Sequence, residues 1–233
     1  MAETIAVVMA GGLGTRLRSL TVAVPKPLLP VGSRAILEII LRQIQRAGIE
    51  RVYVSIGYRG YLVKAFLRDL AIDGLCIEVL EEDEPLGTAG ALALLPPGDE
   101  DVFSMNGDVL TRAPIAEAIA SHAASTASLT MLVHRHPVPL PYGLVDTDGA
   151  RVLGIQEKPT VDFRVATGMY LVRRSVIDAL KVGERVDMPD LITSLIAGGQ
   201  EVRSFEFHEL WTDVADLADY EKVNLNSSEW EDL

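Results

Sequence analysis

Residues 9–31 read MAGGLGTRLRSLTVAVPKPLLPV, and they begin inside the apolar run TIAVVMA of residues 4–10. That run is short, continuously hydrophobic and rich in β-branched side chains, which is typical of a parallel strand buried on both faces. A segment with helical spacing of apolar residues begins at residue 36. A glycine-rich turn between a strand and a helix normally meets phosphate through its backbone N–H groups. The stretch therefore predicts an α/β fold whose first loop binds an anion.

The glycine spacing excludes the two common phosphate-binding loops. No Gly-Lys-Ser/Thr occurs in the sequence, so the Walker pattern is absent. The dinucleotide fingerprint would need a further glycine at position 17 after Gly12 and Gly14, and that residue is Leu17. What remains is a loop in which glycines allow close approach of the backbone to a ligand.

Two cations accompany the loop. Arg16 follows the glycines, and Lys26 stands between two prolines, Pro25 and Pro27. Proline fixes the backbone angle φ, so this pair predicts an ammonium group held at one point. A triphosphate suits that arrangement, because Arg16 could make a forked contact to its outer phosphates and Lys26 could supply a point charge.

Length and composition predict an ordinary globular chain of one domain. It has 233 residues, 48% of them hydrophobic. No apolar run approaches the roughly 20 residues that span a bilayer, so no membrane contact is expected. An acidic residue precedes the first apolar run and no basic segment does, which indicates a mature strand and not a signal peptide. The single cysteine excludes an internal disulfide and suits a reducing cytoplasm.

Charge argues against nucleic-acid binding, since the net charge is −12. Its distribution is uneven: residues 1–60 hold eight Lys/Arg against three Glu, which makes that segment +5. A basic N-terminal quarter in an acidic chain is compatible with a small, highly charged ligand, although ordinary surface charge explains most of these residues equally well.

The remaining pattern alternates strands and helices up to residue 113 and becomes mixed afterwards. Ser33 is expected to cap the first long helix, and Gly48 to end it. We expect strands at 4–10, 51–57, 76–82, 102–108, 128–134, 142–147, 151–157, 165–172 and 201–207, and helices at 36–47, 61–70, from 88, 115–125, 175–181, 189–197 and from 216. The sequence thus predicts a mostly parallel sheet with a mixed second half that could form a small substrate lobe.

The motif GGLGTRL…PKPLLPV resembles the signature of the sugar-1-phosphate nucleotidyltransferases, also called nucleotide-sugar pyrophosphorylases. Further motifs agree with this family in order along nearly the whole chain. The resemblance implies a single Rossmann-like, glycosyltransferase-A-like α/β domain over residues 1–233. Residues 1–113 would form its nucleotide-binding half, and residues 114–233 its sugar-binding half and C-terminal helix. Members are often oligomers, so a homo-oligomer is compatible with it.

The resemblance also implies roles for individual residues. Arg16 and Lys26 would be catalytic, and Mg²⁺ would be held by Asp108, in NGDVL (106–110), and Asp213, in WTDVADLADYEKVN (211–224). The nucleotide would contact Ala10, Gly11, Gly12, Gly14, Thr15 and Asn106, together with Gly87, Thr88 and Ala89 of EPLGTAGAL (84–92). The sugar phosphate would contact Tyr142 and Gly143 in YGLV, Glu157 and Lys158 in EKP, and Thr167 and Gly168 in ATGMY.

The implied reaction joins an NTP and a sugar 1-phosphate to give an NDP-sugar and pyrophosphate. A phosphate oxygen attacks the α-phosphorus in line, so catalysis is mainly positioning and charge neutralisation. One departure concerns the loop after Asp213, where Ala215 and Leu217 stand in place of the Gly and Pro of many members. This departure weakens the assignment of Asp213 as a metal ligand.

Several alternatives stay open at this stage. EPLGTAGAL resembles the guanylyltransferases acting on mannose 1-phosphate, whereas ATGMY resembles thymidylyltransferases and PKPLLPV is shared with uridylyltransferases. GTP is therefore favoured, with UTP or dTTP as alternatives. A non-catalytic regulatory homologue that binds nucleotide-sugars would be expected to lose Arg16, Lys26, Asp108 or Asp213, and all four are present. A glycosyltransferase is disfavoured, because NGD stands where a paired acidic motif is usual.

Other chemically suggestive residues are interpreted as structural. DTD (146–148) precedes Gly149 and is expected in a hairpin. His134 and His136 lack further ligands at zinc spacing. Cys76 is expected in the core, and the acidic runs at 81–84 and 99–101 are expected on solvated loop faces.

Overall fold

The computed structural model of the protein describes residues 4–12 and 14–231, and its elements follow the predicted alternation. In the first half they are β1 (Thr4–Met9), η1 (Thr15–Leu17), α1 (Arg18–Thr21), η2 (Lys26–Leu28), β2 (Pro30–Val31), β3 (Arg34–Ala35), α2 (Ile36–Arg46), β4 (Arg51–Ile56), α3 (Gly60–Asp69), β5 (Cys76–Glu81), α4 (Gly87–Gly90), η3 (Ala91–Leu94), β6 (Asp101–Asn106) and β7 (Val109–Thr111). In the second half they are α5 (Ile115–Ala123), β8 (Leu129–Pro139), β9 (Leu144–Asp148), β10 (Arg151–Gln156), β11 (Thr160–Val172), α6 (Arg174–Asp178), α7 (Met188–Ala197), β12 (Val202–Phe207), β13 (Trp211–Asp213), α8 (Leu217–Leu225) and α9 (Ser228–Glu231).

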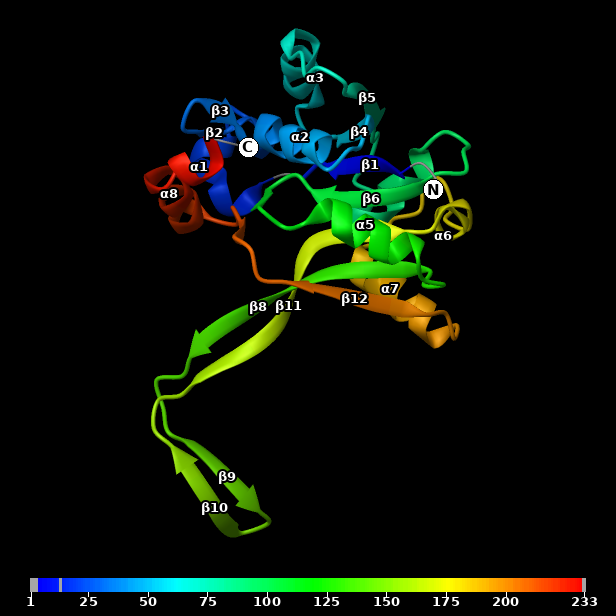
Figure 1. The fold of residues 1–233 in the computed structure, drawn as a ribbon. Coiled ribbons are helices and arrows are strands. Elements are labelled where there is room, and N and C mark those ends of the chain that lie inside the picture. The colour runs from blue at the N-terminus through cyan, green and yellow to red at the C-terminus, as the bar shows by residue number, and fades with distance from the viewer. Residues whose placement is uncertain (1–3, 13, 232–233) are drawn as a thin grey trace.

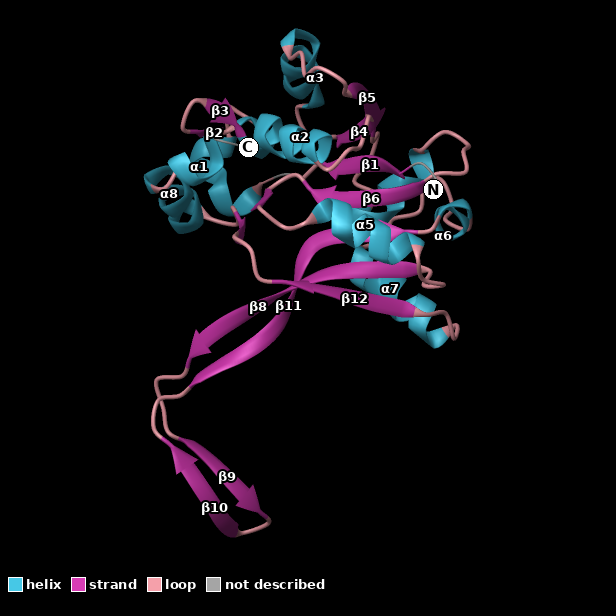
Figure 2. Cartoon of the chain, viewed as in Figure 1, coloured by secondary structure: helices cyan, strands magenta, loops and turns pink. Residues whose placement is uncertain are grey.

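A seven-stranded sheet forms the centre of the molecule, in the order β12-β8-β11-β6-β1-β4-β5. β1 runs parallel to both β4 and β6, β4 is parallel to β5, and β12 is parallel to β8. Only β11 breaks this direction within the described sheet, since it is antiparallel to β6 and β8. Figures 1 and 2 show helices on both sides of the sheet. The predicted mostly parallel α/β sheet is therefore confirmed, and its mixed part falls in the second half as expected.

The first strand is buried on both faces, as its sequence predicts. Ala6 and Val8 pack into a core with residues of α2, α3 and α5, whereas Ile5 and Val7 pack on the other face with residues of α4, α6 and α7. Successive side chains of a strand point to opposite faces, so one uninterrupted apolar run serves two cores. β1 is thereby fixed at the middle of the sheet, and the loop that follows it starts from a rigid point.

The start of α2 differs from the prediction. The N-cap of α2 is Ala35, without a side-chain hydrogen bond, and not Ser33. Residues 30–35 form a small hairpin in which β2 pairs with β3, and Gly32 turns it with φ of +57°. This pairing carries the chain past Ser33 before the helix can begin. The predicted end is confirmed: Gly48 has φ of +83° and its N–H donates to the Gln45 carbonyl at 3.0 Å.

The prediction that Cys76 is a core residue is wrong, because its side chain is exposed. Cys76 opens β5, which lies at the edge of the sheet, and exposed and half-buried positions alternate along this strand. An edge strand with only one covered face leaves alternate side chains in solvent.

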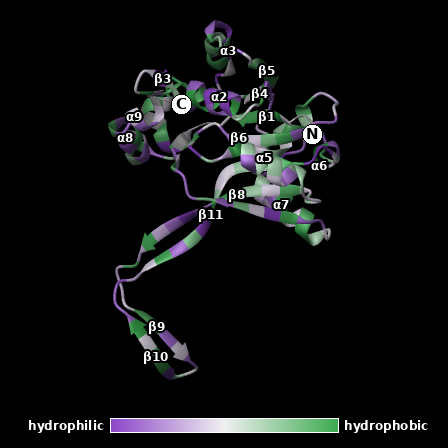
Figure 3. Cartoon of the chain, viewed as in Figure 1, coloured by the Kyte–Doolittle hydropathy of each residue, from purple (hydrophilic) through white to green (hydrophobic). Residues whose placement is uncertain are grey.

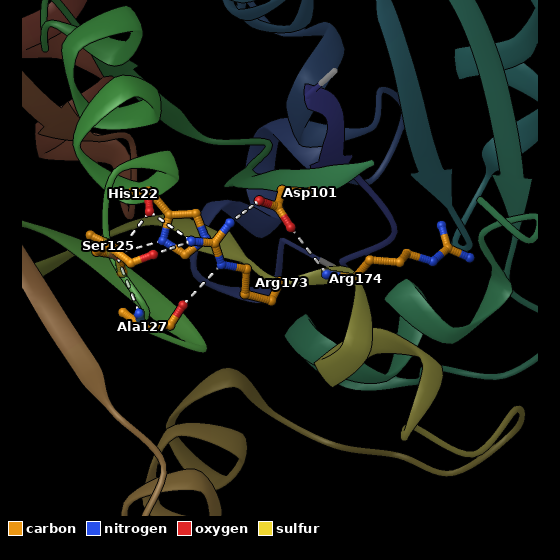
Figure 4. Close-up of polar contacts among 7 residues, drawn as sticks. Asp101, His122, Ser125, Ala127, Arg173 and Arg174 are labelled. Carbon is orange, nitrogen blue, oxygen red and sulfur yellow. Dashed lines mark hydrogen bonds and ion pairs between the residues drawn. The ribbon is translucent and has the colours of Figure 1, made fainter. Parts of the chain in front are cut away.

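A cluster around Arg173 connects β11 to β6 and to the turn after α5 (Figure 4). The Arg173 guanidinium pairs with Asp101 at 2.6 Å and donates to three carbonyls, those of His122 at 2.9 Å, Ser125 at 2.6 Å and Ala127 at 3.1 Å. One planar guanidinium thus connects a carboxylate with the turn after α5. The prediction that the acidic run 99–101 is solvated is wrong for Asp101, which is buried against this guanidinium.

β8 and β11 continue beyond the sheet as a two-stranded ladder, and β9 and β10 form a hairpin at its far end. Figure 1 shows this segment projecting away from the rest of the molecule. The predicted hairpin is confirmed, with Asp148 paired to Arg151. Among the residues that the structure describes, no helix is long and apolar enough to cross a membrane.

Candidate active site

A cavity of about 320 Å³ lies at the carboxyl ends of the central strands. Met9 ends β1, Asn106 ends β6 and Glu82 directly follows β5, and all three line the cavity. Open α/β sheets bind ligands at this edge. The other lining residues are Ala10, Gly11, Gly12, Gly14, Arg16, Lys26, Pro27, Pro85, Gly87, Thr88, Gly107, Asp108 and Ala215. The structure thus brings the two predicted cations and most of the predicted nucleotide-binding residues to one cavity.

Two glycines of the cavity leave no space for a side chain. A Cβ at Gly11 would come within 2.7 Å of a Glu82 carboxylate oxygen. A Cβ at Gly87 would come within 2.5 Å of the Val186 carbonyl oxygen, and the φ of Gly87 is +79°. Position 87 therefore requires glycine for both its backbone angle and the close approach, whereas a side chain at Gly11 would displace the Glu82 carboxylate.

Lys26 and Asp108 form an ion pair at the cavity. Lys26 opens the short helix η2, where the Leu28 N–H donates to Pro25 and the Leu29 N–H donates to Lys26 itself. Asp108 follows β6 in the turn that leads to β7. The side chains are only 12% and 25% exposed, respectively. The lysine between the two prolines thus has its ammonium on a carboxylate of the cavity.

Asp213 lies beside this pair. β13 pairs with β7 so that Asp213 is opposite Val109, and the Val214 N–H donates to the Asp108 carbonyl at 2.9 Å. Burial raises the pKa of the Asp213 carboxyl above its ordinary value, and the neighbouring Asp108 carboxylate raises it further. Ala215 reaches the cavity, although Asp213 is not among the residues that line it. Two carboxylates that repel each other at one place form a donor set that suits a cation.

These two carboxylates are suitable ligands for a divalent metal ion that is bound together with substrate phosphates. Within the described residues, no group of three or more His, Cys, Asp or Glu gathers to hold a metal ion. Mg²⁺ is commonly held by one or two carboxylates together with substrate phosphates and water. Asp108 and Asp213 match that smaller requirement.

Several predicted residues have structural contacts of their own. The Thr88 N–H donates to Asp187, and the Thr88 hydroxyl accepts from the Met188 N–H at 2.8 Å. Ala89 is fully buried, and its N–H donates to the Val186 carbonyl. The Thr167 hydroxyl donates to Leu132, and Gly168 lies against the Asn106 amide. Thr15 belongs to η1, but its side chain lies outside the described part of the chain.

Four predicted sugar-phosphate residues do not lie at the cavity. Tyr142, Gly143, Glu157 and Lys158 are exposed, where the β8–β11 ladder passes into the β9–β10 hairpin. Lys158 has φ of +45°, a left-handed conformation that is uncommon for a residue other than glycine. A Cβ at Gly143 would come within 3.2 Å of the Glu157 carboxylate, so at least these two positions are neighbours.

Sequence reasoning missed Glu82. The prediction that the acidic run 81–84 is solvated holds for Glu81, Asp83 and Glu84, but Glu82 is half-buried and lines the cavity. The Ser55 hydroxyl donates to one of its oxygens, and the Leu86 N–H donates to the other at 2.9 Å. Its position directly after a strand, like that of Asp108 after β6, is the signal that could have identified it.

The family model for the nucleotidyl transferases matches residues 5–229. The chain belongs to this family. Mannose-1-phosphate guanylyltransferase of Mycobacterium tuberculosis is 34% identical over 223 residues, and mannose-1-phosphate guanyltransferase of Neurospora crassa is 30% identical over 225 residues. Each alignment covers 92% of this nucleotidyl transferase chain but only 62% of the relative. The chain therefore spans less than two thirds of the length of these curated relatives.

Solved structures share the fold of this nucleotidyl transferase. A putative glucose-1-phosphate thymidylyltransferase from Bacillus anthracis superposes with a TM-score of 0.76 at 22% identity, covering 96% of this chain and 95% of that one. HddC from Yersinia pseudotuberculosis, in complex with GMP-PN, gives a TM-score of 0.73 at 22% identity, covering 97% and 99%. At these identities the likeness supports the predicted fold alone.

Proposed function

We propose that this chain joins an NTP and a sugar 1-phosphate to give an NDP-sugar and pyrophosphate. The main support for this proposal is the cavity at the carboxyl ends of β1 and β6. It is lined by the glycine loop, Arg16, Lys26 and Asp108. The names of the relatives, mannose-1-phosphate guanylyltransferases, support the same reaction class.

The chemistry follows from the charges of these residues. An oxygen of the sugar phosphate attacks the α-phosphorus of the nucleotide, and the bond to pyrophosphate breaks, so no covalent enzyme intermediate is needed. Two anions must approach to about 3–3.5 Å for this step. Arg16 and Lys26 neutralise phosphate charge, and the backbone of the glycine loop donates to phosphate oxygens. Mg²⁺ on Asp108 and Asp213 supplies further neutralisation at the phosphates when bound.

GTP is the nucleotide that we propose, and Glu82 gives a physical reason for it. Its carboxylate lines the cavity and only accepts hydrogen bonds. Each oxygen already accepts one bond, from Ser55 or Leu86, and keeps further capacity. Guanine presents two adjacent donors, the N1–H and the 2-amino group, whereas uracil and thymine present one N–H between two carbonyl oxygens. A carboxylate therefore pairs with guanine and repels the flanking oxygens of the pyrimidines.

We also propose that the reaction takes place in the cytoplasm. The one cysteine of the chain suits a reducing compartment.

The test is a panel of GTP, UTP, dTTP, CTP and ATP with mannose, glucose and heptose 1-phosphates in the presence of Mg²⁺, monitored by pyrophosphate release. We expect release with GTP, and a loss of at least a hundredfold in Lys26→Met. Lys181→Met is the matched control, because Lys181 is 82% exposed and pairs only loosely with Glu184. Nucleotide binding without release in every combination would contradict the transferase proposal and favour a regulatory role.

A further inference from the structure

Residues 135–165 form a projecting segment, here called the arm. It comprises the outer parts of β8 and β11 together with the β9–β10 hairpin, and none of its residues is buried. Figure 3 shows apolar residues along it. An isolated two-stranded hairpin is at best marginally stable in water. No surface within residues 4–12 and 14–231 therefore covers the arm.

The exposed apolar area of the arm is large. Its large apolar side chains that stand out in solvent are Tyr142 (78% exposed), Leu144 (46%), Val145 (48%), Val152 (62%), Leu153 (57%), Ile155 (69%) and Phe163 (49%). Summed over both faces of the arm they expose roughly 700 Å², which is on the scale of the largest apolar patch of a typical monomer, about 300–600 Å². Two such arms in a symmetric pair, with the surfaces that they cover, would supply a large part of the roughly 1,600 Å² that a stable interface buries.

One face of the hairpin is apolar by register. Val145 pairs with Ile155, and Thr147 pairs with Val152, so these side chains point to the same side. Gly143 lies next to Ile155 and Glu157 on the same side. The apolar face thus leads directly to the predicted sugar-phosphate residues.

Where the arm leaves the central sheet, its contacts hold it pointing away from the rest of the molecule. β11 pairs continuously with β8 from Thr160 to Ala166. Arg135 and Arg164, one on each strand, both donate to Glu206 of β12, at 2.6 and 2.7 Å. These two guanidinium groups lower the pKa of the Glu206 carboxyl to about 2, so the ion pairs persist at neutral pH. The ladder cannot fold back without breaking these contacts.

Lys158 is consequently out of reach of its own cavity. Gly168 lies against Asn106, which lines the cavity, and Lys158 precedes Gly168 by ten positions along the chain. At about 3.3 Å per residue, that distance is roughly 30 Å. Meanwhile, among the described residues that line the cavity, the cations are Arg16 and Lys26, and Lys26 is already paired with Asp108. A cavity for two phosphate esters therefore needs a further cation, and the arm of the same chain cannot supply it.

Charge allows the arm to approach a second copy. Residues 135–165 hold four Lys/Arg and four Asp/Glu, so the arm is neutral, and the whole charge of −12 belongs to the remainder of the chain. The acidic remainders of two copies repel each other. The neutral arm can contact a second copy with the smallest electrostatic repulsion.

We propose that the arm of one copy lies across the cavity of a second copy, where Tyr142, Glu157 and Lys158 bind the sugar 1-phosphate. This proposal rests on the proposed transferase function. The dimer is symmetric and reciprocal, each cavity being completed by the partner's arm. The left-handed backbone of Lys158 is a strained conformation that fits a side chain held for a ligand.

The assembly is tested first, without any activity. We expect the full chain to have twice its 25.3 kDa mass in sedimentation equilibrium. Ile155→Ser should weaken this dimer at least tenfold. The matched control is Ile196→Ser, because Ile196 is 59% exposed on α7, away from the arm. A monomeric wild-type chain, or equal weakening by both substitutions, would overturn the proposal.

The trans contact is tested by complementation. Lys26→Met and the double variant Glu157→Gln/Lys158→Met are each expected to be inactive. Co-expressed with different tags and isolated as the mixed dimer, they should recover about half of the wild-type rate, since one of two sites then combines an intact cavity with an intact arm. An inactive mixed dimer, or an active double variant on its own, would refute the contact. A wild-type chain inactive on every substrate would instead refute the proposed function, while the mass measurement would still decide the dimer.

Discussion

The buried imidazole of His122 should make folding stability depend on pH. His122 is 2% exposed, and its Nδ1 lies 2.8 Å from the Thr130 hydroxyl. Its Nε2 is buried without a hydrogen-bond partner among the described residues. Burial lowers the pKa of His122 from 6.5 to about 4, and the nearby Arg173 guanidinium contributes to the same shift. The folded state therefore holds the ring neutral.

The sign follows from the two pKa values. Between about pH 4 and 6.5 the unfolded chain binds a proton at this ring that the folded chain does not. The stabilisation is thus fully present above pH 6.5 and is lost as the pH falls toward 4. At about 1.4 kcal/mol per pH unit, the full shift from 6.5 to about 4 corresponds to roughly 3.5 kcal/mol of unfolding free energy, most of which is lost by pH 4.

His122→Asn isolates this contribution. Asparagine can keep a hydrogen bond to Thr130 and does not titrate, so its packing defect is the same at every pH. Urea unfolding followed by circular dichroism from pH 4 to 8 gives the free energy for both chains. We expect the difference in unfolding free energy between the two chains to fall by roughly 3 kcal/mol between pH 8 and pH 4. Parallel curves over this range would refute the reasoning, because carboxylates common to both chains cancel in the difference.

Three further substitutions have expected results. Arg173→Met should lower the unfolding free energy, measured in urea, by about 3–5 kcal/mol, because it leaves the Asp101 carboxylate buried without its cation. An equal loss of unfolding free energy in the exposed control Arg203→Met would contradict this. Gly87→Ala should lower the urea midpoint more than Gly183→Ala, since both have positive φ but only Gly87 has a carbonyl within 2.5 Å of the added Cβ; equal shifts would show that the backbone angle alone matters. Glu82→Gln should reduce the ratio of kcat/KM for GTP over UTP at least tenfold, and an unchanged ratio would exclude Glu82 from base selection.

The sequence predicts the central strands and the glycine loop because local signals decide both. The β-branched run at 4–10 has few alternatives to a buried strand, and the Gly48 terminus depends on one residue's backbone freedom. The cavity likewise follows from topology, since carboxyl ends of parallel strands meet at one edge. Lys26 and Asp108, 82 residues apart, come together for that reason.

The failures arise where long-range pairing overrides local preference. Ser33 is a good capping residue, yet β2–β3 pairing moves the start of α2 to Ile36. Cys76 sits in an apolar run, but β5 is an edge strand and exposes it. The direction of the arm depends on Arg135 and Arg164 meeting Glu206, which no local pattern indicates. Whether a sequence motif lies at a site or roughly 30 Å from it is decided by tertiary contacts.

The ion pair between Lys26 and Asp108 has a consequence for the order in which ligands bind. Each group is the other's counter-ion, so a phosphate that takes the ammonium frees a carboxylate, and a divalent cation that takes the carboxylate frees an ammonium. Nucleotide affinity should then rise with magnesium concentration, and magnesium affinity with nucleotide, by one and the same factor, as thermodynamic reciprocity requires. The ion pair of the unliganded protein would in this way couple the binding of the anionic nucleotide to the binding of the metal cation.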